Sequence, residues 1–303
     1  MLIEAVDKYL SVRRSVGFKL EETERYLRSF SSFADGRGDS HVVSESAIAW
    51  ASQGPSEAQR DTRLKIVIRF ARFARAEDEQ HEIPPDGVFC GQRHRPTPYI
   101  FSDEEVRQVV AEASRLRPSG CLRPHTYSTL FGLLAVTGLR PSEGRNLKLT
   151  DLTTDGLVIR ASKFRKTRLV PLHETTTIAL QNYLARRSKV AGHDEHLFVS
   201  NRGRQLPRRT VSRTFHKVVE AAGIARSSGR SSPHLMDLRH TFAVRVLERC
   251  PDSRDHVRRH MLALTTYMGH ARVENTYWYL ESTPELMVDI ARATETFVEG
   301  GTP

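Results

Sequence analysis

Apolar residues recur every three or four positions through most of the first ninety residues, which is the spacing of helices that bury one side. Leu2, Val6 and Leu10 follow this spacing, and Gly17 supplies a stop. The pattern predicts three further helices: one over residues 21–33, one capped by Ser44 that runs through Trp50, and one over residues 56–76. The start of the chain is therefore expected to form a helical domain.

The helical spacing breaks over residues 77–98, where four prolines and an Asp-Gly pair gather. Such a composition is typical of a linker. Just after it, Ser102 and Glu105 have the spacing of a capping box, which predicts the start of a new helix. We therefore expect a helical domain over residues 1–90, a linker over residues 91–98 and a second domain over residues 99–303.

Most of the second domain has helical spacing as well. The exception lies between Leu157 and Leu172, where two short β-prone segments flank the basic turn of residues 163–166. A further extended fragment over residues 197–200 could join them. The expected fold class is mainly α with a small antiparallel sheet.

Composition narrows the setting in which the protein works. The 303 residues are 39% hydrophobic and 27% charged, as in ordinary globular proteins. The longest largely apolar run, residues 130–139, is too short to span a bilayer, and the first residues lack the order of a signal peptide. Cys90, Cys121 and Cys250 are too far apart in the sequence to suggest a disulfide framework or a zinc site. These features predict a cytoplasmic protein without a membrane partner.

The net charge of +10 suggests a polyanionic partner, and the charge is unevenly distributed. Residues 1–90 hold 13 Lys and Arg against 15 Asp and Glu, whereas residues 91–303 hold 33 against 21. Within the first domain, the helix over residues 56–76 carries basic residues opposite its apolar side: Arg60, Lys65, Arg69 and Arg72. Such a face is usually just solvated, but packed against DNA it would contact phosphates.

The sequence TGLRPSE, residues 137–143, is the first motif that suits phosphate chemistry. Gly138 ends an apolar helix, and Arg140 lies on the turn into another helix, where Pro141 suits the first position. An arginine held there can present its fork of donors to a phosphate. Glu143 could orient a basic partner, although an ordinary surface ion pair explains it equally well.

Two later motifs contain further candidates. In DLRHTFA, Arg239 and His240 open a helix, which is also the pattern of a helix start with two exposed polar residues. Farther on, Gly269 ends a short helix, His270 follows it, and Tyr279 stands nine residues later within an aromatic cluster. A lone histidine is usually structural and an aromatic cluster is usually core. Two tyrosines only two residues apart, however, do not fit one apolar face.

The order of these motifs resembles that of the tyrosine recombinases, or phage integrases. TGLRPSE comes first, then a lysine between two short strands followed by RLVPL, then DLRHTFA, then GH with a tyrosine nine residues on. The resemblance covers the chain from about residue 99 to its C-terminus, and the first ninety residues resemble the family's core-site DNA-binding domain. It implies a tyrosine-recombinase catalytic domain in a site-specific recombinase that cleaves and rejoins DNA through a 3′-phosphotyrosyl intermediate.

The resemblance also assigns roles to residues. The implied catalytic residues are Arg140, Lys163, Arg239, His270 and Tyr279. The two arginines would clamp the scissile phosphate, and Tyr279 would be the nucleophile. Lys166 is the near neighbour with which Lys163 could be confused. Glu143 matches an acidic residue that supports the site, and His240 is expected to be structural.

One position departs from the family's pattern. Three residues before the second arginine the family usually has a histidine, and this chain has Met236. A thioether can neither donate nor relay a proton at neutral pH. His234 lies two residues earlier and would need a local change of register to substitute for it. The sequence therefore leaves open an impaired member of the family that binds DNA without efficient cleavage.

The residue types suit transfer of a phosphoryl group to tyrosine. Two arginines stabilise negative charge on the nonbridging oxygens without titrating. A tyrosine hydroxyl, with a pKa near ~10, loses its proton more readily beside cations. A lysine can bring a proton to the leaving 5′-oxygen. The phosphotyrosyl link keeps the phosphate in an ester bond that a second strand can attack. No cofactor is therefore expected, neither ATP nor a metal ion.

Two other function classes fit less well. A type IB topoisomerase uses similar chemistry, but the small size and the helical first domain are more typical of recombinases. Relaxation of plasmid DNA without any specific site would favour the topoisomerase. A transcriptional regulator would leave Tyr279 and the arginine pair unexplained.

Strand exchange sets the expected partners. Because exchange needs two duplexes, we expect a homotetramer on two paired sites of double-stranded DNA, which accessory recombinases or factors could join. No further module precedes the first helical bundle, which favours a recombinase of a transposable element or the chromosome over an integrase with arm-binding modules.

Overall fold

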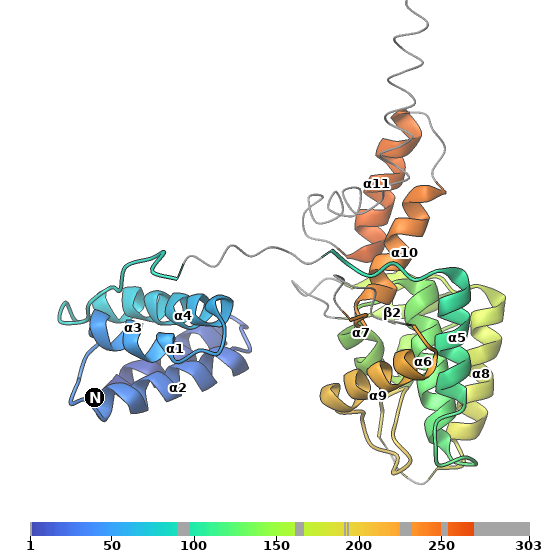
Figure 1. Cartoon of the computed structure of the whole chain (residues 1–303), viewed down its shortest axis with the longest axis horizontal. Helices are drawn as coiled ribbons and strands as arrows, with labels where there is room; N and C mark the ends of the chain where they lie inside the picture. The colour runs from blue at the N-terminus through green and yellow to red at the C-terminus, as the bar shows by residue number, and fades with distance from the viewer. Residues whose placement is uncertain are drawn as a thin grey trace, which may run out of the picture. The chain divides into compact units, whose positions relative to one another are not determined.

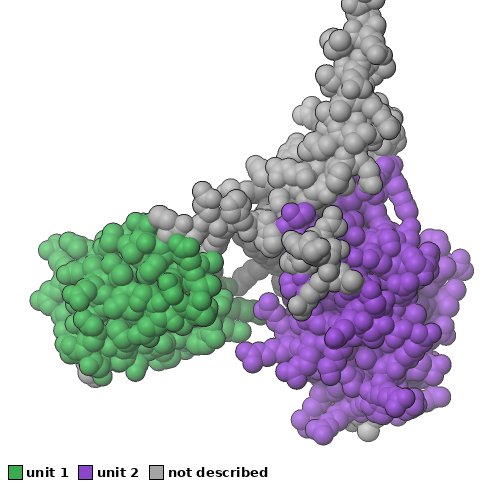
Figure 2. Space-filling model, in the orientation of Figure 1, with its two compact units in different colours: residues 1–95 green, residues 96–303 purple. Residues whose placement is uncertain are grey.

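The computed structural model describes residues 2–89, 97–160, 167–190, 192, 194–224, 232–249 and 254–269, with the backbone alone for residues 254–258. The chain separates into two compact units, Met1–Arg95 and Pro96–Pro303, shown in different colours in Figure 2. Each unit has its own hydrophobic core. In the part of the chain so described, no helix is long and apolar enough to cross a membrane.

The first unit is a helical bundle, as its apolar spacing predicted. Its helices are α1 (Leu2–Ser15), α2 (Glu21–Asp35), α3 (Ser44–Ser52) and α4 (Glu57–Arg75) (Figure 1). Helix α4 contacts each of the other three. Leu64, Val67 and Phe70 on α4 are almost completely buried, so this helix supplies the centre of the core.

The start of α3 differs from the prediction. Ser44 is the first residue of the helix rather than its cap, because Val43 takes the cap position without a capping side-chain bond. The backbone N of Ser44 donates instead to Glu82 Oε2 at 2.7 Å, and the backbone N of Glu82 donates to the carbonyl of Val42 at 2.8 Å. A carboxylate at a helix N-terminus is favoured by the helix dipole. The linker-like segment after α4 therefore folds onto the first unit, where His81 is buried.

The second unit is mainly helical with one small antiparallel sheet, which confirms the expected fold class. Its helices are α5 (Asp103–Ser114), α6 (Leu122–Thr137), α7 (Pro141–Asn146), the short η1 (Leu149–Asp151), α8 (Glu174–Arg187), α9 (Arg208–Ala221), α10 (Asp237–Glu248) and α11 (Arg254–Met268). The strands are β1 (Leu152–Thr153), β2 (Gly156–Ile159) and β3 (Arg168–Val170), in the order β1-β2-β3. Leu157 pairs with Val170 and Ile159 with Arg168, so the two β-prone segments form a hairpin.

Helix α6 lies at the centre of the second unit, in contact with α5, α8 and α10 (Figure 1). Leu130 and Phe131 on α6 are fully buried. The ring of Phe131 packs edge-to-face on Phe215 of α9 at 5.2 Å between centroids. A smaller apolar cluster, which includes Val244 and Leu264, joins α10 to α11. Helix α6 also contacts α7, and α10 in turn packs against α11.

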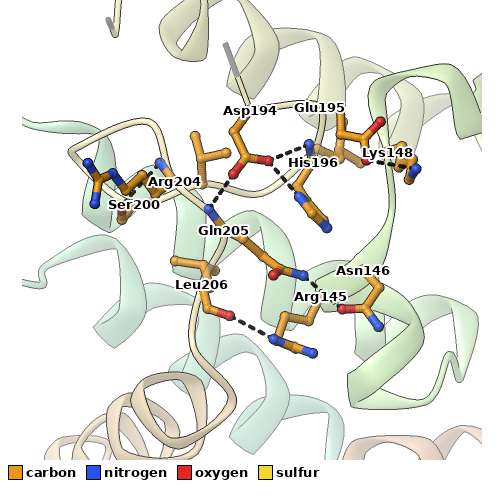
Figure 3. Close-up of polar contacts among 12 residues, drawn as sticks. Arg145, Asn146, Lys148, Asp194, Glu195, His196, Ser200, Arg204, Gln205 and Leu206 are labelled. Carbon is orange, nitrogen blue, oxygen red and sulfur yellow. Dashed lines mark hydrogen bonds and ion pairs between the residues drawn. The ribbon is translucent and has the colours of Figure 1, made fainter. Parts of the chain in front are cut away.

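The extended fragment expected around Val199 does not join the sheet. Among the described residues this segment makes only isolated bridges, from Lys148 to His196 and from Val199 to Gln205. The carboxylate of Asp194 accepts hydrogen bonds from the backbone N of His196 at 2.9 Å and of Gln205 at 2.8 Å (Figure 3). On its other side the segment pairs with residues 147–149, where the backbone N of Leu197 donates to the carbonyl of Leu147 at 2.7 Å.

Candidate active site

The TGLRPSE motif forms the turn between α6 and α7. Gly138 ends α6 with a φ of +59°, and a Cβ atom there would lie 2.4 Å from the ring of Phe242. Both facts require glycine at this position. Arg140 immediately precedes α7, and Pro141 occupies the first helical position. The turn thus fixes the backbone that carries the Arg140 side chain.

Glu143 holds Arg140 at two points. Its Oε2 accepts a hydrogen bond from the Arg140 backbone N at 3.0 Å, and its Oε1 accepts one from Arg140 Nη1 at 2.7 Å. The Glu143 side chain is only 7% exposed and that of Arg140 is 19% exposed. The pair is therefore not the ordinary surface ion pair that the sequence left open.

Arg239 of α10 reaches the same place from another part of the chain. Its side chain is buried, with Nη1 donating to the carbonyl of Gly138 and Nη2 to that of Met268, both at 2.7 Å. Arg140 Nη2 donates to the carbonyl of Gly269 at 3.0 Å. Because Met268 and Gly269 are consecutive, the two guanidinium groups lie close together at the end of α11.

The Arg140 side chain has donors beyond these contacts. A guanidinium carries five N–H groups, and the two bonds to Glu143 and Gly269 use two of them. Because the side chain is partly exposed, its fork can reach an acceptor that approaches from outside. A phosphate oxygen is the acceptor that such a fork suits best.

A third arginine, Arg168 of β3, completes the cluster. Its Nη2 donates to Glu143 Oε2 at 2.8 Å and its Nη1 to Glu143 Oε1 at 3.2 Å. Burial raises the pKa of Glu143, but the hydrogen bonds and charges of Arg168 and Arg140 outweigh burial and lower the pKa to about 2. Glu143 is therefore a carboxylate at neutral pH. In the sequence, Arg168 served only to set the register of RLVPL, and nothing linked it to TGLRPSE.

Tyr267 of α11 is a second residue that the motifs did not single out. It is half-buried, and its ring stacks on Phe242 at 5.5 Å between centroids. Burial raises the pKa of Tyr267, against the positive charges of Arg168 and Arg239, which lower it. The Tyr267 hydroxyl therefore keeps its proton at neutral pH close to the arginine cluster.

Comparison with known proteins shows the family to which the chain belongs. The sequence model of the Phage integrase family matches residues 99–285, more than half of the chain.

The chain belongs to the phage integrase family. Its relatives include y4rB of Sinorhizobium fredii, named as an integrase/recombinase, which is 40% identical over 96% of each chain. Another is the tyrosine recombinase XerD of Brucella abortus, 30% identical over 76% of this chain and 73% of its own. This integrase is a tyrosine-type site-specific DNA recombinase, as the order of its motifs predicted.

Solved structures share the fold of this integrase. The Tn1549 transposon integrase, in complex with transposon right end DNA, has a TM-score of 0.66 at 16% identity and covers 98% of this chain and 99% of its own. The XerH site-specific recombinase bound to its difH substrate has a TM-score of 0.63 at 17% identity, over 94% and 83% of the two chains. At these identities the likeness establishes the fold.

The start of α10 carries Met236, at the position where the family resemblance predicts a histidine. Met236 directly precedes the helix, is 40% exposed, and accepts a hydrogen bond at its carbonyl from the backbone N of Arg239 at 3.0 Å. The ring of His234 packs edge-to-face on His216 of α9 at 5.5 Å, and its backbone N donates to Asp237 Oδ2 at 2.6 Å. A thioether thus stands one helical turn before Arg239, and His234 is engaged with α9.

The other predicted residues of the integrase are only partly accessible to description. His240 follows Arg239 on α10 and is half-buried, and its supporting role stays a prediction. Lys163, His270 and Tyr279 lie outside the described residues.

In the first unit, the predicted DNA-binding residues of α4 fall into two groups. Lys65, Arg69 and Arg72 are exposed, and their spacing of four and three residues puts them on one helix face. Arg60 departs from the prediction, because it is half-buried and its Nε donates to the carbonyl of Gly54 at 2.8 Å. The exposed residues that can contact a polyanion are therefore Lys65, Arg69 and Arg72. We call these three residues the α4 face.

A second basic face, which the sequence reasoning missed, lies along α9 of the integrase. Arg209, Arg213 and Lys217 are exposed, recur every four residues, and line an open hollow of about 590 Å³ together with Glu220. The spacing of basic residues in RRTVSRTFHK could have revealed this face in the sequence. We call these three residues the α9 face.

The segment that leads into α9 is tied to α7, the helix that follows Arg140. Gln205 Nε2 donates to Asn146 Oδ1 at 3.0 Å, and Arg145 Nη1 donates to the carbonyl of Leu206 at 3.0 Å (Figure 3). The two bonds fix the start of α9 relative to the turn that holds Arg140.

Proposed function

We propose that this recombinase cleaves one DNA strand by attack of Tyr279 on a phosphodiester whose nonbridging oxygens are held by Arg140 and Arg239. The observation that carries the proposal is the pair of guanidinium groups that donate to the carbonyls of Met268 and Gly269. Two cations held together by backbone acceptors form a preorganised site for a dianionic transition state.

The arginines act through charge and position rather than proton transfer. Attack on a phosphodiester increases the negative charge on the nonbridging oxygens, and arginine keeps its positive charge at every relevant pH. Donors that are already oriented need no reorganisation when the charge develops, and losing one such donor typically costs about 10²–10³ in rate. Burial of Arg239 strengthens the effect because the surrounding dielectric is low.

The bond changes follow from the matched motif residues. The phenolic oxygen of Tyr279 loses its proton and bonds to phosphorus, while the bond from phosphorus to the 5′-oxygen breaks. Lys163 gives a proton to that oxygen, and His270 assists at the phosphate. The product is a 3′-phosphotyrosyl link and a free 5′-hydroxyl, which later attacks the link in a partner strand.

A second candidate function is DNA binding with slow cleavage, and the thioether of Met236 favours it. General acid–base help is typically worth about 10²–10⁴ in rate, so its loss at this position slows an otherwise assembled site. His234 would have to leave its contact with His216 to substitute. We infer that the natural enzyme is slow and still active.

DNA contacts are proposed for both units. The α4 face of Lys65, Arg69 and Arg72 makes the first unit the core-site DNA-binding domain, and the α9 face serves the catalytic unit. Contacts of this kind go mainly to phosphates, so affinity is expected to fall steeply with salt.

Strand exchange further implies a homotetramer on two paired duplex sites, acting in the cytoplasm, with room for accessory recombinases. A lambda integrase of the same fold has been solved as a tetramer bound to a Holliday junction, at a TM-score of 0.60 and 19% identity.

Covalent capture tests the reaction. The protein is incubated with sheared DNA of the source cell, denatured, and recovered with any DNA that stays attached, and the attached ends are sequenced. We expect one recurrent sequence, linked through a 3′-phosphate to the peptide that contains Tyr279.

Tyr279→Phe is expected to abolish attachment and to retain DNA binding, whereas Tyr277→Phe retains both. Attachment at Tyr277, or attachment that survives in Tyr279→Phe, would reject the assignment of the nucleophile. If no variant with an intact Tyr279 becomes attached, including Met236→His, the DNA-binding function is the better conclusion.

A further inference from the structure

The carboxylate of Glu143 lies between two arginines, and each of its oxygens accepts from both. Oε1 accepts from Arg140 Nη1 at 2.7 Å and from Arg168 Nη1 at 3.2 Å. Oε2 accepts from the Arg140 backbone N at 3.0 Å and from Arg168 Nη2 at 2.8 Å. The orientation of the carboxylate that aims Arg140 is thus set from its other side by Arg168.

Arg168 is held in this place although its burial leaves one of its donors unsatisfied among the described residues. Its side chain is only 11% exposed, and its Nε atom has no hydrogen-bond partner among the described residues. Its Nη1 atom lies so close to Gly269 that a Cβ atom there would be 2.9 Å away. Gly269 is the residue whose carbonyl accepts from Arg140. Arg168 therefore touches both partners that hold the Arg140 guanidinium.

We propose that Arg168 is a positioning residue for strand cleavage, which keeps Arg140 aimed through Glu143 and offsets the negative charge of that carboxylate. The proposal rests on the function proposed above, because it assumes that Arg140 binds the scissile phosphate. Arg168 itself does not touch the phosphate in this account, and it acts through the carboxylate and the Gly269 turn.

Arg168 changes the charge balance around Arg140. Arg140 and Glu143 alone form a neutral pair, and a neutral pair has little attraction for a phosphate. With Arg168 the group of three carries a net charge of +1, since Glu143 stays ionised beside the two arginines. Arg168 thus offsets the negative charge that is needed to orient Arg140.

The geometric part concerns the carboxylate plane. Two parallel N–H donors from one planar guanidinium fix that plane, whereas a lysine ammonium supplies a single point charge. Arg168→Met removes both charge and fork, and Arg168→Lys removes only the fork. The two variants therefore separate the electrostatic contribution from the geometric one.

The test measures strand cleavage by the full chain on the duplex recovered by covalent capture, with two forms of the scissile phosphate. One is the natural diester, and in the other a methyl group replaces one nonbridging oxygen and removes its charge. On the natural diester we expect Arg168→Met to cut about 10- to 100-fold more slowly, less than the loss of a direct donor, and Arg168→Lys to be intermediate. DNA binding should stay within about threefold, since the proposal gives Arg168 no contact with DNA.

On the neutral phosphate, the defect of Arg168→Met should shrink to a few-fold, because there is less charge for Arg140 to stabilise. A merely structural arginine would give the same defect on both substrates. Arg187→Met supplies that control: Arg187 of α8 is partly buried and donates to the carbonyls of Asp194, His196 and Leu197, away from Arg140. It should lower the melting temperature with an equal effect on both substrates.

Each outcome decides something. An equal loss on the two phosphates for Arg168→Met, or no loss at all while Arg140→Ala abolishes cleavage, overturns the positioning role. Full cleavage by Arg140→Ala instead rejects the proposed function itself. If Arg168→Met does not fold, Arg168→Lys, which keeps the ion pair, is compared on the two substrates under the same criteria.

Discussion

The second unit buries basic side chains in its arginine cluster, whereas the first unit exposes basic side chains on the α4 face. Arg239 is 2% exposed, and both of its Nη atoms donate to backbone carbonyls. Arg69 of α4 is exposed, and its Nε donates to the carbonyl of Lys65, its neighbour on the same helix. The buried arginine is thus held by contacts to two segments distant in sequence, whereas the exposed one contacts only its own helix.

This difference in burial distinguishes residues expected to affect the cleavage rate from residues expected to affect DNA affinity. A transition state is stabilised by donors that already point at the developing charge. A DNA backbone, by contrast, is attracted by positive charge almost regardless of its exact placement. Substitutions in the cluster should therefore change the rate of cleavage, and substitutions on the α4 face should change the affinity for DNA.

Substitution of Met236 should have the largest effect on the cleavage rate, because it would place a proton donor beside the arginine cluster. We expect Met236→His to raise the cleavage rate by about 10²–10⁴-fold with unchanged DNA affinity. Met236→Ala should change the rate little, because the thioether supplies no proton. Single-turnover cleavage of the captured duplex measures all three. An unchanged rate for Met236→His together with a dead His234→Ala would show that His234 is the working residue.

Arg239→Lys tests whether orientation matters in the cluster. The exchange keeps the charge but loses the fork, so cleavage should fall by about 10²–10³ with binding nearly intact. The matched exchange on the α4 face, Arg69→Lys, should change cleavage by less than about threefold, because a phosphate there needs only a point charge. Equal effects of the two exchanges in the same cleavage assay would remove the distinction between the two regions.

Lowering the pH should destabilise the arginine cluster by protonating Glu143. Its pKa is about 2 in the folded chain against a usual value of 4.5, so the ionised form contributes stability that is fully present above pH 4.5. That contribution is lost as the pH falls from 4.5 towards 2, and at about 1.4 kcal/mol per pH unit it amounts to about 3 to 4 kcal/mol. Urea unfolding across this range measures it. Glu143→Gln should flatten the pH dependence in that window, and an unchanged slope would contradict the assignment.

Neutralising the α4 face is the mildest test. Changing Lys65, Arg69 and Arg72 together to Gln should lower DNA affinity about tenfold at moderate salt. It should also reduce the slope of log K against log salt by about 2 to 3, as the loss of three phosphate contacts requires. Cleavage at saturating DNA should stay the same. A titration at several salt concentrations gives the slope, and an unaltered slope would mean that this face does not meet DNA.

The helices of both units followed closely from local signals. Ser102 and Glu105 form the capping box that their spacing predicted at the start of α5. Gly138 ends α6 in the left-handed conformation, as a glycine after an apolar helix suggests. The prediction that Ser44 caps α3 was wrong because its backbone N donates to Glu82, which is distant in the sequence. Local capping rules cannot anticipate a carboxylate that arrives from another segment.

The sequence by itself determined which residues could carry the chemistry. Arg140 and Arg239 stand out because each opens a helix within a motif, and the order of the motifs was enough to indicate the family. These are properties of short segments, set by backbone geometry and side-chain type over a few neighbouring residues. The same is true of the exposed basic residues of α4.

Only the tertiary structure decided what surrounds those residues. Arg168 joins Glu143 because β3 and α7 meet in the folded unit, and Arg140 and Arg239 come together because Met268 and Gly269 present consecutive carbonyls to them. The buried Glu143 then keeps a pKa of about 2 because Arg168 and Arg140 outweigh burial, which alone would raise that pKa. Such contacts depend on long-range packing, which brings together segments whose spacing in the sequence carries no trace of the encounter.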